Sequence, residues 1–372
     1  MNNPFVLGVI PPGAPFCDRS RELKELTSYA KSKANVVLYS PRRYGKTSLI
    51  KRAQSTLADK GFIAIYIDLF GVTSIDEVAN RTVKSIYSVT KYDDSLFKKA
   101  VRILKTFRPV LRPTEAGDAF SISVEAVAGK LSGIDLLDAT LDNLGEFINK
   151  AHKGIHIVFD EFQEITELNS QQIEGVLRSH IQGHGASYFF VGSRRRLLLD
   201  MFSQRNRPFF QSSIIYQLNR LPHGDLVNFI MDCFQSKGKH CPAEVAEEIS
   251  TKVLQHPYYV QKLSFYEFEM TDKTAKIEDV AKAYERVFEE ERYFFEATLQ
   301  GITLKQTSLL KAIANDPFVP VFSTEFLSTY RLALGMVQKA LPKLAKLDLI
   351  EKNEKKYWHI VDPVFEDWLR RM

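Results

Sequence analysis

Eight consecutive residues, Ser40-Pro-Arg-Arg-Tyr-Gly-Lys-Thr47, have the types and spacing of a phosphate-binding loop. They nearly match G-x-x-x-x-G-K-[ST], with Ser40 in place of the first glycine. In such a loop, backbone N–H groups and the N-terminus of the next helix point at anionic oxygens. We therefore predict a nucleotide-phosphate site formed by Ser40, Pro41, Arg42, Arg43, Tyr44, Gly45, Lys46, Thr47 and Ser48.

Within this loop the individual side chains suit different tasks. Gly45 allows close approach of the backbone, Lys46 can neutralise the β- and γ-phosphates, and the Thr47 hydroxyl can ligate Mg²⁺. A chance Gly-Lys-Thr in a surface turn is the alternative, and the apolar run before the loop and the helical pattern after it disfavour that alternative. Ser40 is expected to alter the loop geometry if its position requires a positive φ.

A second candidate group is the pair Asp160-Glu161, which directly follows the apolar run from Ile155 to Phe159. Two carboxylates at the end of a strand suit a magnesium-assisted hydrolase: Asp160 would hold Mg²⁺ through a water molecule, and Glu161 would polarise the attacking water. The alternative is a strand that simply ends in a polar turn, and the phosphate loop upstream favours the hydrolase. Because the chain has no N-K-x-D run to read guanine, we expect ATP.

The next apolar run ends in Gly192-Ser193-Arg194-Arg195-Arg196. A hydroxyl there can sense the γ-phosphate and an arginine can bind it, so Ser193 and Arg194 are further candidates. The alternative is three solvated arginines at the start of a helix. Arg178 is placed at the end of the preceding helix, where ring-forming ATPases can carry an arginine that acts on a neighbouring subunit.

Short apolar runs alternate with helical patterns through the first two hundred residues. Strands are expected at 35–39, 62–69, 155–159, 188–191 and 213–218, and helices between them, for example at 48–57 and 137–151. This alternation is typical of βαβ units and predicts an α/β fold with a parallel sheet and helices on both faces. A hairpin over 109–126 would be inserted between the second and third strands.

After Pro222 the pattern becomes helical up to about residue 300. A third unit begins with a capping box at Thr303, continues through a helix capped by Ser323 and a helix at 334–347, and ends in a hairpin at 349–361. That order is typical of a winged helix-turn-helix. We expect an α/β domain at 1–220, a helical lid at 221–300 and a winged helix at 301–372.

The composition excludes several classes of protein. With 372 residues and 45% hydrophobic residues, the chain is an ordinary globular protein, and no apolar run approaches the ~18 residues of a membrane span. The N-terminus lacks the features of a signal peptide. Three scattered cysteines exclude a disulfide framework and favour a cytoplasmic protein. The net charge of +5 is too small to indicate nucleic-acid binding by itself.

Taken together, these motifs resemble the archaeal-type ATPase family, a group of AAA+/STAND-like phosphate-loop proteins distantly similar to replication-origin initiators. The resemblance covers nearly the whole chain. Besides the loop and the acidic pair, it rests on Phe16-Cys-Asp-Arg19, Glu22-Leu23, Phe162-Gln-Glu164, Val191-Gly-Ser193, His256-Pro-Tyr-Tyr-Val-Gln261 and Asp362-Pro-Val-Phe-Glu-Asp-Trp-Leu369.

The resemblance implies a nucleotide-binding α/β domain, a helical lid and a C-terminal winged helix. It also implies that Phe16 and Arg19 pack near the adenine and that the turn at His256 and Pro257 brings the lid over the base. The alternatives are a core aromatic at Phe16 and a histidine at a helix start at His256. In the family a glycine often precedes this turn, and Gln255 stands in its place. The sequence therefore departs from the family pattern at the turn that positions the lid.

Two functions remain open for the C-terminal unit. Residues 303–372 hold eleven Lys and Arg against eight Asp and Glu, a net charge of +3, and Pro342 interrupts the candidate recognition helix. The small charge and the proline favour at most weak DNA binding. From the loop and the acidic pair we expect slow, Mg²⁺-dependent ATP hydrolysis. The alternative is a signalling switch that docks a protein partner when ATP is bound. Oligomerisation is compatible with both functions.

Overall fold

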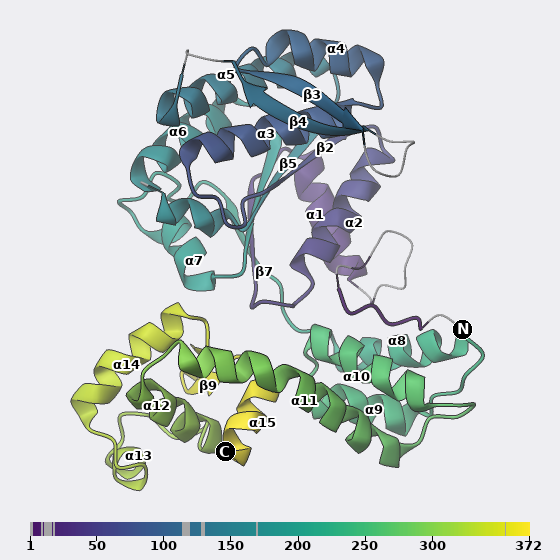
Figure 1. Cartoon of the computed structure of the whole chain (residues 1–372), viewed down its shortest axis with the longest axis vertical. Helices are drawn as coiled ribbons and strands as arrows, with labels where there is room; N and C mark the ends of the chain where they lie inside the picture. The colour runs from purple at the N-terminus through teal and green to yellow at the C-terminus, as the bar shows by residue number, and fades with distance from the viewer. Residues whose placement is uncertain are drawn as a thin grey trace. The chain divides into compact units, whose positions relative to one another are not determined.

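The computed structural model describes residues 3–8, 10, 17, 19–113, 120–127, 131–168, 170–353 and 355–372. The described chain forms two compact units (Figure 1). The α/β unit comprises Ser20–Ser40 and Lys46–Leu218. The helical unit comprises Pro41–Gly45, Asn219–Met372 and the described residues among the first nineteen.

The α/β unit is built on a five-stranded sheet in the order β2-β5-β6-β1-β7, in which every neighbouring pair is parallel. Strands β1, β5 and β6 are buried along their whole length, because helices cover both faces of the sheet. The strands are β1 (Val36–Tyr39), β2 (Ile63–Asp68), β5 (Ile155–Asp160), β6 (Ser187–Gly192) and β7 (Ile214–Gln217).

In Figure 1, α1 and α2 lie on one side of this sheet, and α5, α6 and α7 lie on the other. Helix α3 contacts β2 and α5 and also packs against α4 and against the hairpin formed by β3 and β4. The bounds are α1 (Ser20–Lys31), α2 (Lys46–Ala58), α3 (Ile75–Thr90), α4 (Asp94–Ile103), β3 (Phe107–Pro113), β4 (Phe120–Ala126), α5 (Gly133–Ala151), the 3₁₀ helix η1 (Phe162–Glu167), α6 (Ser170–Gly183) and α7 (Arg195–Ser203).

The sequence predictions for this unit are confirmed in outline. All five strands and the inserted hairpin are present, and the fold class is the expected one. One detail differs: Arg178 lies within α6 rather than at its end.

The helical unit begins with α8 (His223–Gln235), α9 (Ala243–Lys252), α10 (Pro257–Met270) and α11 (Ile277–Gln300), and continues with α12 (Leu304–Asn315), α13 (Thr324–Thr329), α14 (Leu334–Lys346), β8 (Ile350–Lys352), β9 (Trp358–Ile360) and α15 (Pro363–Arg371). Thr303 forms the expected capping box and Ser323 caps α13. Pro342 lies inside α14 as expected.

One hydrophobic core joins the segments of this unit. Phe295 of α11 packs against Phe365 and Trp368 of α15, with ring centroids 5.0 and 5.7 Å apart. Helix α15 is an addition to the predicted elements. It is capped by Asp362, whose carboxylate accepts hydrogen bonds from the backbone N–H groups of Val364 and Phe365. None of the described helices is both long enough and apolar enough to cross a membrane.

Candidate functional site

The phosphate loop leaves β1 at Ser40 and enters α2 at Lys46. The Lys46 ammonium is buried and donates to the Ser40 backbone carbonyl at 3.1 Å and to its hydroxyl at 3.3 Å. The loop residues with positive φ are Arg43, at 63°, and Gly45, at 85°. Ser40 does not have a positive φ, so the condition for an altered loop geometry is not met: the left-handed backbone lies further along the loop, and a serine fits the first position without strain.

Thr47 and Asp160 meet at the C-terminal ends of the strands. The Thr47 hydroxyl donates to Asp160 Oδ2 at 3.0 Å, and the Tyr66 hydroxyl of β2 donates to the same oxygen. Burial raises the pKa of Asp160, and the hydrogen bond from Tyr66 opposes that shift. A hydroxyl and a carboxylate oxygen are ligands of the kind that Mg²⁺ prefers, so Thr47 and Asp160 would be the residues to hold that ion.

Glu161 is the second acid and has left-handed backbone, with φ 51°. Its carboxylate accepts hydrogen bonds from the Ser193 hydroxyl at 2.9 Å and from Gln163 Nε2 at 2.5 Å. A Cβ on Gly192 would lie 2.1 Å from Gln163 Oε1, so only glycine lets this side chain approach. The ends of β5 and β6 thus hold the Glu161 carboxylate in a defined place beside Asp160.

Arg194 is directed elsewhere. Its guanidinium lies 3.4 Å from Glu167 and 3.9 Å from Glu164, both on η1. The structure therefore brings Ser193, but not Arg194, to the acidic pair.

Three further candidates lie in the helical unit. Arg19 is buried and donates to the Asn219 carbonyl at 2.7 Å. His256 is buried directly before α10, and Pro257 is the first residue of that helix. Gln255 has φ 54°, the conformation that favours the glycine it replaces. Phe16 lies outside the described residues.

The His256 ring packs against the rings of Tyr44 and Tyr259, and its centroid lies 4.9 Å from the centroid of each. Burial, with the charges of Arg220 and Arg43, lowers the pKa of His256 to about 3. The imidazole is therefore neutral at physiological pH and packs against the two tyrosine rings as an uncharged aromatic group.

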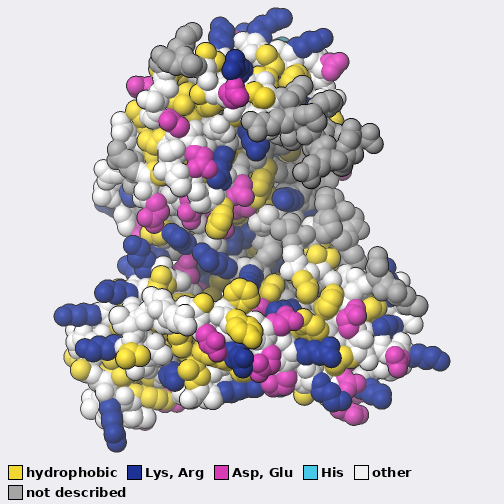
Figure 2. Space-filling model, in the orientation of Figure 1, with side chains coloured by type: hydrophobic (Ala, Val, Ile, Leu, Met, Phe, Trp, Pro, Cys, Tyr) yellow, Lys and Arg dark blue, Asp and Glu magenta, His cyan; other side chains and the backbone are white. Residues whose placement is uncertain are grey.

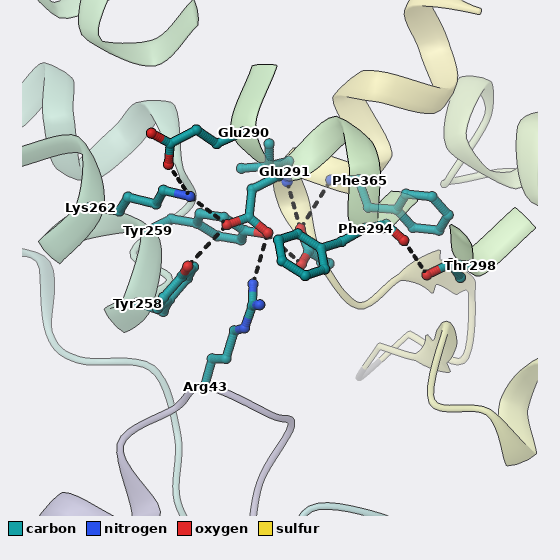
Figure 3. Close-up of polar contacts among 11 residues, drawn as sticks. Arg43, Tyr258, Tyr259, Lys262, Glu290, Glu291, Phe294, Thr298 and Phe365 are labelled. Atoms are coloured by element: carbon teal, nitrogen blue, oxygen red, sulfur yellow. Dashed lines mark hydrogen bonds and ion pairs between the residues drawn. The ribbon is translucent and has the colours of Figure 1, made fainter. Parts of the chain in front are cut away.

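Sequence reasoning missed one residue and one cluster here. The residue is Tyr66, which the sequence places in an apolar strand without indicating its hydrogen bond to Asp160. The other is the Glu291 cluster, made of Arg43, Tyr258, Lys262, Glu290 and Glu291 (Figure 3). The sequence does carry a signal for the cluster: Glu291 falls on the buried stripe of α11, between Phe288 and Phe295.

A phosphate loop after one parallel strand, with an acidic pair at the end of another, defines a P-loop nucleoside triphosphatase. Residues 16–263 match the model of an ATPase domain found predominantly in Archaea, and residues 293–371 match a probable winged helix domain. The chain belongs to this archaeal ATPase family, and it is a P-loop ATPase with a C-terminal winged helix.

Solved structures share the fold. The Walker-type ATPase paby2304 of Pyrococcus abyssi is 16% identical, with a TM-score of 0.71 over 98% of this chain and 99% of that one. The ORC2 protein of Aeropyrum pernix, solved as ADPNP–ADP complexes, is 16% identical, with a TM-score of 0.59 over 99% of this chain and 96% of that one. A search among curated proteins finds no match to this sequence.

Proposed function

We propose that the protein binds ATP–Mg²⁺ at the loop from Ser40 to Ser48 and hydrolyses it slowly, with Glu161 as the general base. The observation that carries this proposal is the acidic pair: Asp160 lies 3.0 Å from the Thr47 hydroxyl, while Ser193 and Gln163 hold Glu161. Adenine is favoured because the sequence lacks a guanine-reading run and because the similar ORC2 protein was solved with ADPNP and ADP.

Each residue has a stated task in this proposal. Lys46 binds the β- and γ-phosphates, and Thr47 and Asp160 hold Mg²⁺, which neutralises phosphate charge when bound. Ser193 orients Glu161 so that its carboxylate accepts a proton from the attacking water. Arg19, His256, Pro257 and Phe16 are proposed to form the adenine side of the site.

The nucleotide state is proposed to change how three parts of the chain are arranged, namely the α/β domain at 1–220, the lid at 221–300 and the winged helix at 301–372. A ligand can shift such an arrangement only by binding one state more tightly than the other. ATP and ADP differ in the γ-phosphate, so the groups proposed to meet that phosphate, Lys46 and Ser193, can discriminate between them. We propose that the protein acts in the cytoplasm.

Glu161→Gln tests the hydrolytic part of the proposal. Glutamine keeps the size of the side chain and can still accept from Gln163, so the fold and ATP affinity should change little. Turnover should fall by roughly 10²-fold or more, because a general base is lost. Glu167→Gln is the matched control, since this exposed acid pairs with Arg194 and not with Ser193. Equal turnover in Glu161→Gln and wild type would contradict the assignment.

A second candidate activity is DNA binding, favoured by the match to a winged helix domain. Figure 2 shows several Lys and Arg side chains projecting from the end of the helical unit that carries α13 and α14. Lys343, Lys346, Lys352, Lys355 and Lys356 are all exposed. Pro342 and the small net charge favour phosphate contacts over base readout.

A salt titration separates this candidate from the protein-docking switch. Binding through phosphates should fall steeply with salt, and Lys352, Lys355 and Lys356 changed together to Ala should weaken it on every duplex and flatten the salt slope. Tight binding to one sequence at high salt would instead indicate base readout. No binding at low salt would favour a protein partner.

A further inference from the structure

The Glu291 carboxylate is buried in the helical unit, with 1% of its side chain exposed. Oε1 accepts hydrogen bonds from Lys262 Nζ at 2.7 Å and from the Tyr258 hydroxyl at 3.0 Å, and Oε2 accepts one from Arg43 Nη1 at 2.9 Å (Figure 3). A buried carboxylate stays ionised only when it is paired in this way. Arg43 belongs to the phosphate loop, so a partly exposed loop residue pairs with this buried carboxylate.

The charges of the Glu291 cluster balance. Two acids, Glu290 and Glu291, meet two bases, Lys262 and Arg43. Burial alone would raise the pKa of Glu291, but hydrogen bonds from Lys262 and Arg43 outweigh it and hold that pKa below its usual range. The Arg43 guanidinium also lies over the Tyr258 ring, 4.3 Å from its centroid. Its charge is therefore engaged by protein groups.

The backbone of Arg43 is in an unfavourable conformation, which the contact with Glu291 helps to explain. Arg43 has φ 63°, a left-handed conformation that disfavours any residue with a Cβ. The bond from Arg43 to Glu291 is an interaction whose energy can offset that cost. Gly45, two residues on, has φ 85°, so the loop tip turns through two such positions before α2 begins.

We propose that Glu291 is a positioning residue for the phosphate loop: by anchoring Arg43, it holds the loop tip ready for phosphates. Arg43 then acts as an anchor and Lys46 as the phosphate cation. This inference rests on the proposed ATP site. The inference predicts the direction of the change in ATP affinity. A loop released from Glu291 has to be ordered when ATP binds, which reduces the binding free energy, so removing the anchor weakens the affinity for ATP.

The test is a double-mutant cycle on ATP affinity, measured with Mg²⁺ by calorimetry on the full chain. Glu291→Gln and Arg43→Gln should each raise the Kd for ATP by about 5- to 30-fold, the range expected if binding must restore one left-handed residue. The double variant should be no weaker than Arg43→Gln alone, because both changes break the same bond. Arg43→Lys should recover part of the loss, since it restores the charge but not the planar fork.

Glu290→Gln is the matched control. Glu290 neighbours Glu291 on α11 and binds the same Lys262, at 2.9 Å, but it does not touch Arg43. Its ATP affinity should stay within about twofold of wild type. A role in stability alone would lower the melting temperature of Glu291→Gln without changing the Kd. Arg43 is 39% exposed, so Arg43→Gln tests the same bond even if Glu291→Gln folds poorly.

The remaining outcomes overturn the proposal in distinguishable ways. Unchanged affinity in both single variants, with a binding wild type, would remove the positioning role and leave the ATP site intact. Tighter ATP binding by Glu291→Gln would show that Arg43 is a phosphate ligand which Glu291 withholds. Absence of ATP binding by the wild type would overturn the ATP site and this inference together.

Discussion

His256 makes the stability of the helical unit depend on pH in a calculable way. The imidazole is buried against Tyr44 and Tyr259, and burial together with Arg220 and Arg43 lowers its pKa from 6.5 to about 3. The unfolded chain therefore binds a proton here below about pH 6.5 and the folded chain does not. The stability due to the neutral ring is fully present above pH 6.5 and is lost as the pH falls toward 3.

Linkage gives the magnitude. Between pH 7 and pH 5 this one group costs about 2 kcal/mol of unfolding free energy. Glu267 of α10 has the opposite sign: burial, followed by the charge of Asp279, raises its pKa from 4.5 to about 7. Its contribution is fully present below pH 4.5 and is lost as the pH rises through 7, so between pH 7 and pH 5 it gains about 2 kcal/mol.

Urea unfolding at the two pH values separates the two groups. Both tryptophans, Trp358 and Trp368, belong to the helical unit, so their fluorescence reports on it alone. Relative to wild type, His256→Asn should gain about 2 kcal/mol on going from pH 7 to pH 5, and Glu267→Gln should lose about 2 kcal/mol. Other titrating groups cancel in these differences. The reasoning is refuted if both variants follow the wild type to within about 0.5 kcal/mol.

Two further changes have definite expected outcomes. Tyr66→Phe removes a hydrogen bond that opposes the raised pKa of Asp160, so the acid limb of the ATP turnover profile should move to higher pH; an unmoved limb would show that Asp160 does not limit turnover. Pro342→Ala should raise the unfolding free energy of the helical unit by about 1–3 kcal/mol, because the exposed proline lacks the N–H of a helix interior; an unchanged urea midpoint would show that the packing of α14 has already absorbed the kink.

Local sequence patterns were enough to predict most of the elements. Strands buried on both faces appear as short apolar runs, and capping residues mark helix starts, as at Thr303 and Ser323. Apolar runs of this kind do not predict the order of the strands in the sheet. Nothing in the chain indicated that β6 lies between β1 and β5, an arrangement that brings Ser193 to Glu161.

Contacts between distant residues explain what sequence reasoning missed. The loop residues, Asp160 and Glu161 follow from a motif, because the chemistry fixes their types and spacing. Tyr66 and Glu291 do not, since their partners lie 94 and 248 residues away along the chain. An acid on the apolar stripe of an amphipathic helix, such as Glu291 on α11, was the available signal, because a buried acid must either pair with another group or stay protonated.

The central claim is that the loop from Ser40 to Ser48 binds the phosphates of ATP. Calorimetric titration of ATP–Mg²⁺ into wild type and Lys46→Ala tests it most directly, because Lys46 is the loop cation held at the start of α2 on the Ser40 carbonyl. Wild type should bind one ATP per chain, and Lys46→Ala should bind it at least about tenfold more weakly while unfolding at the same temperature. Equal affinity in a folded Lys46→Ala protein would contradict the claim.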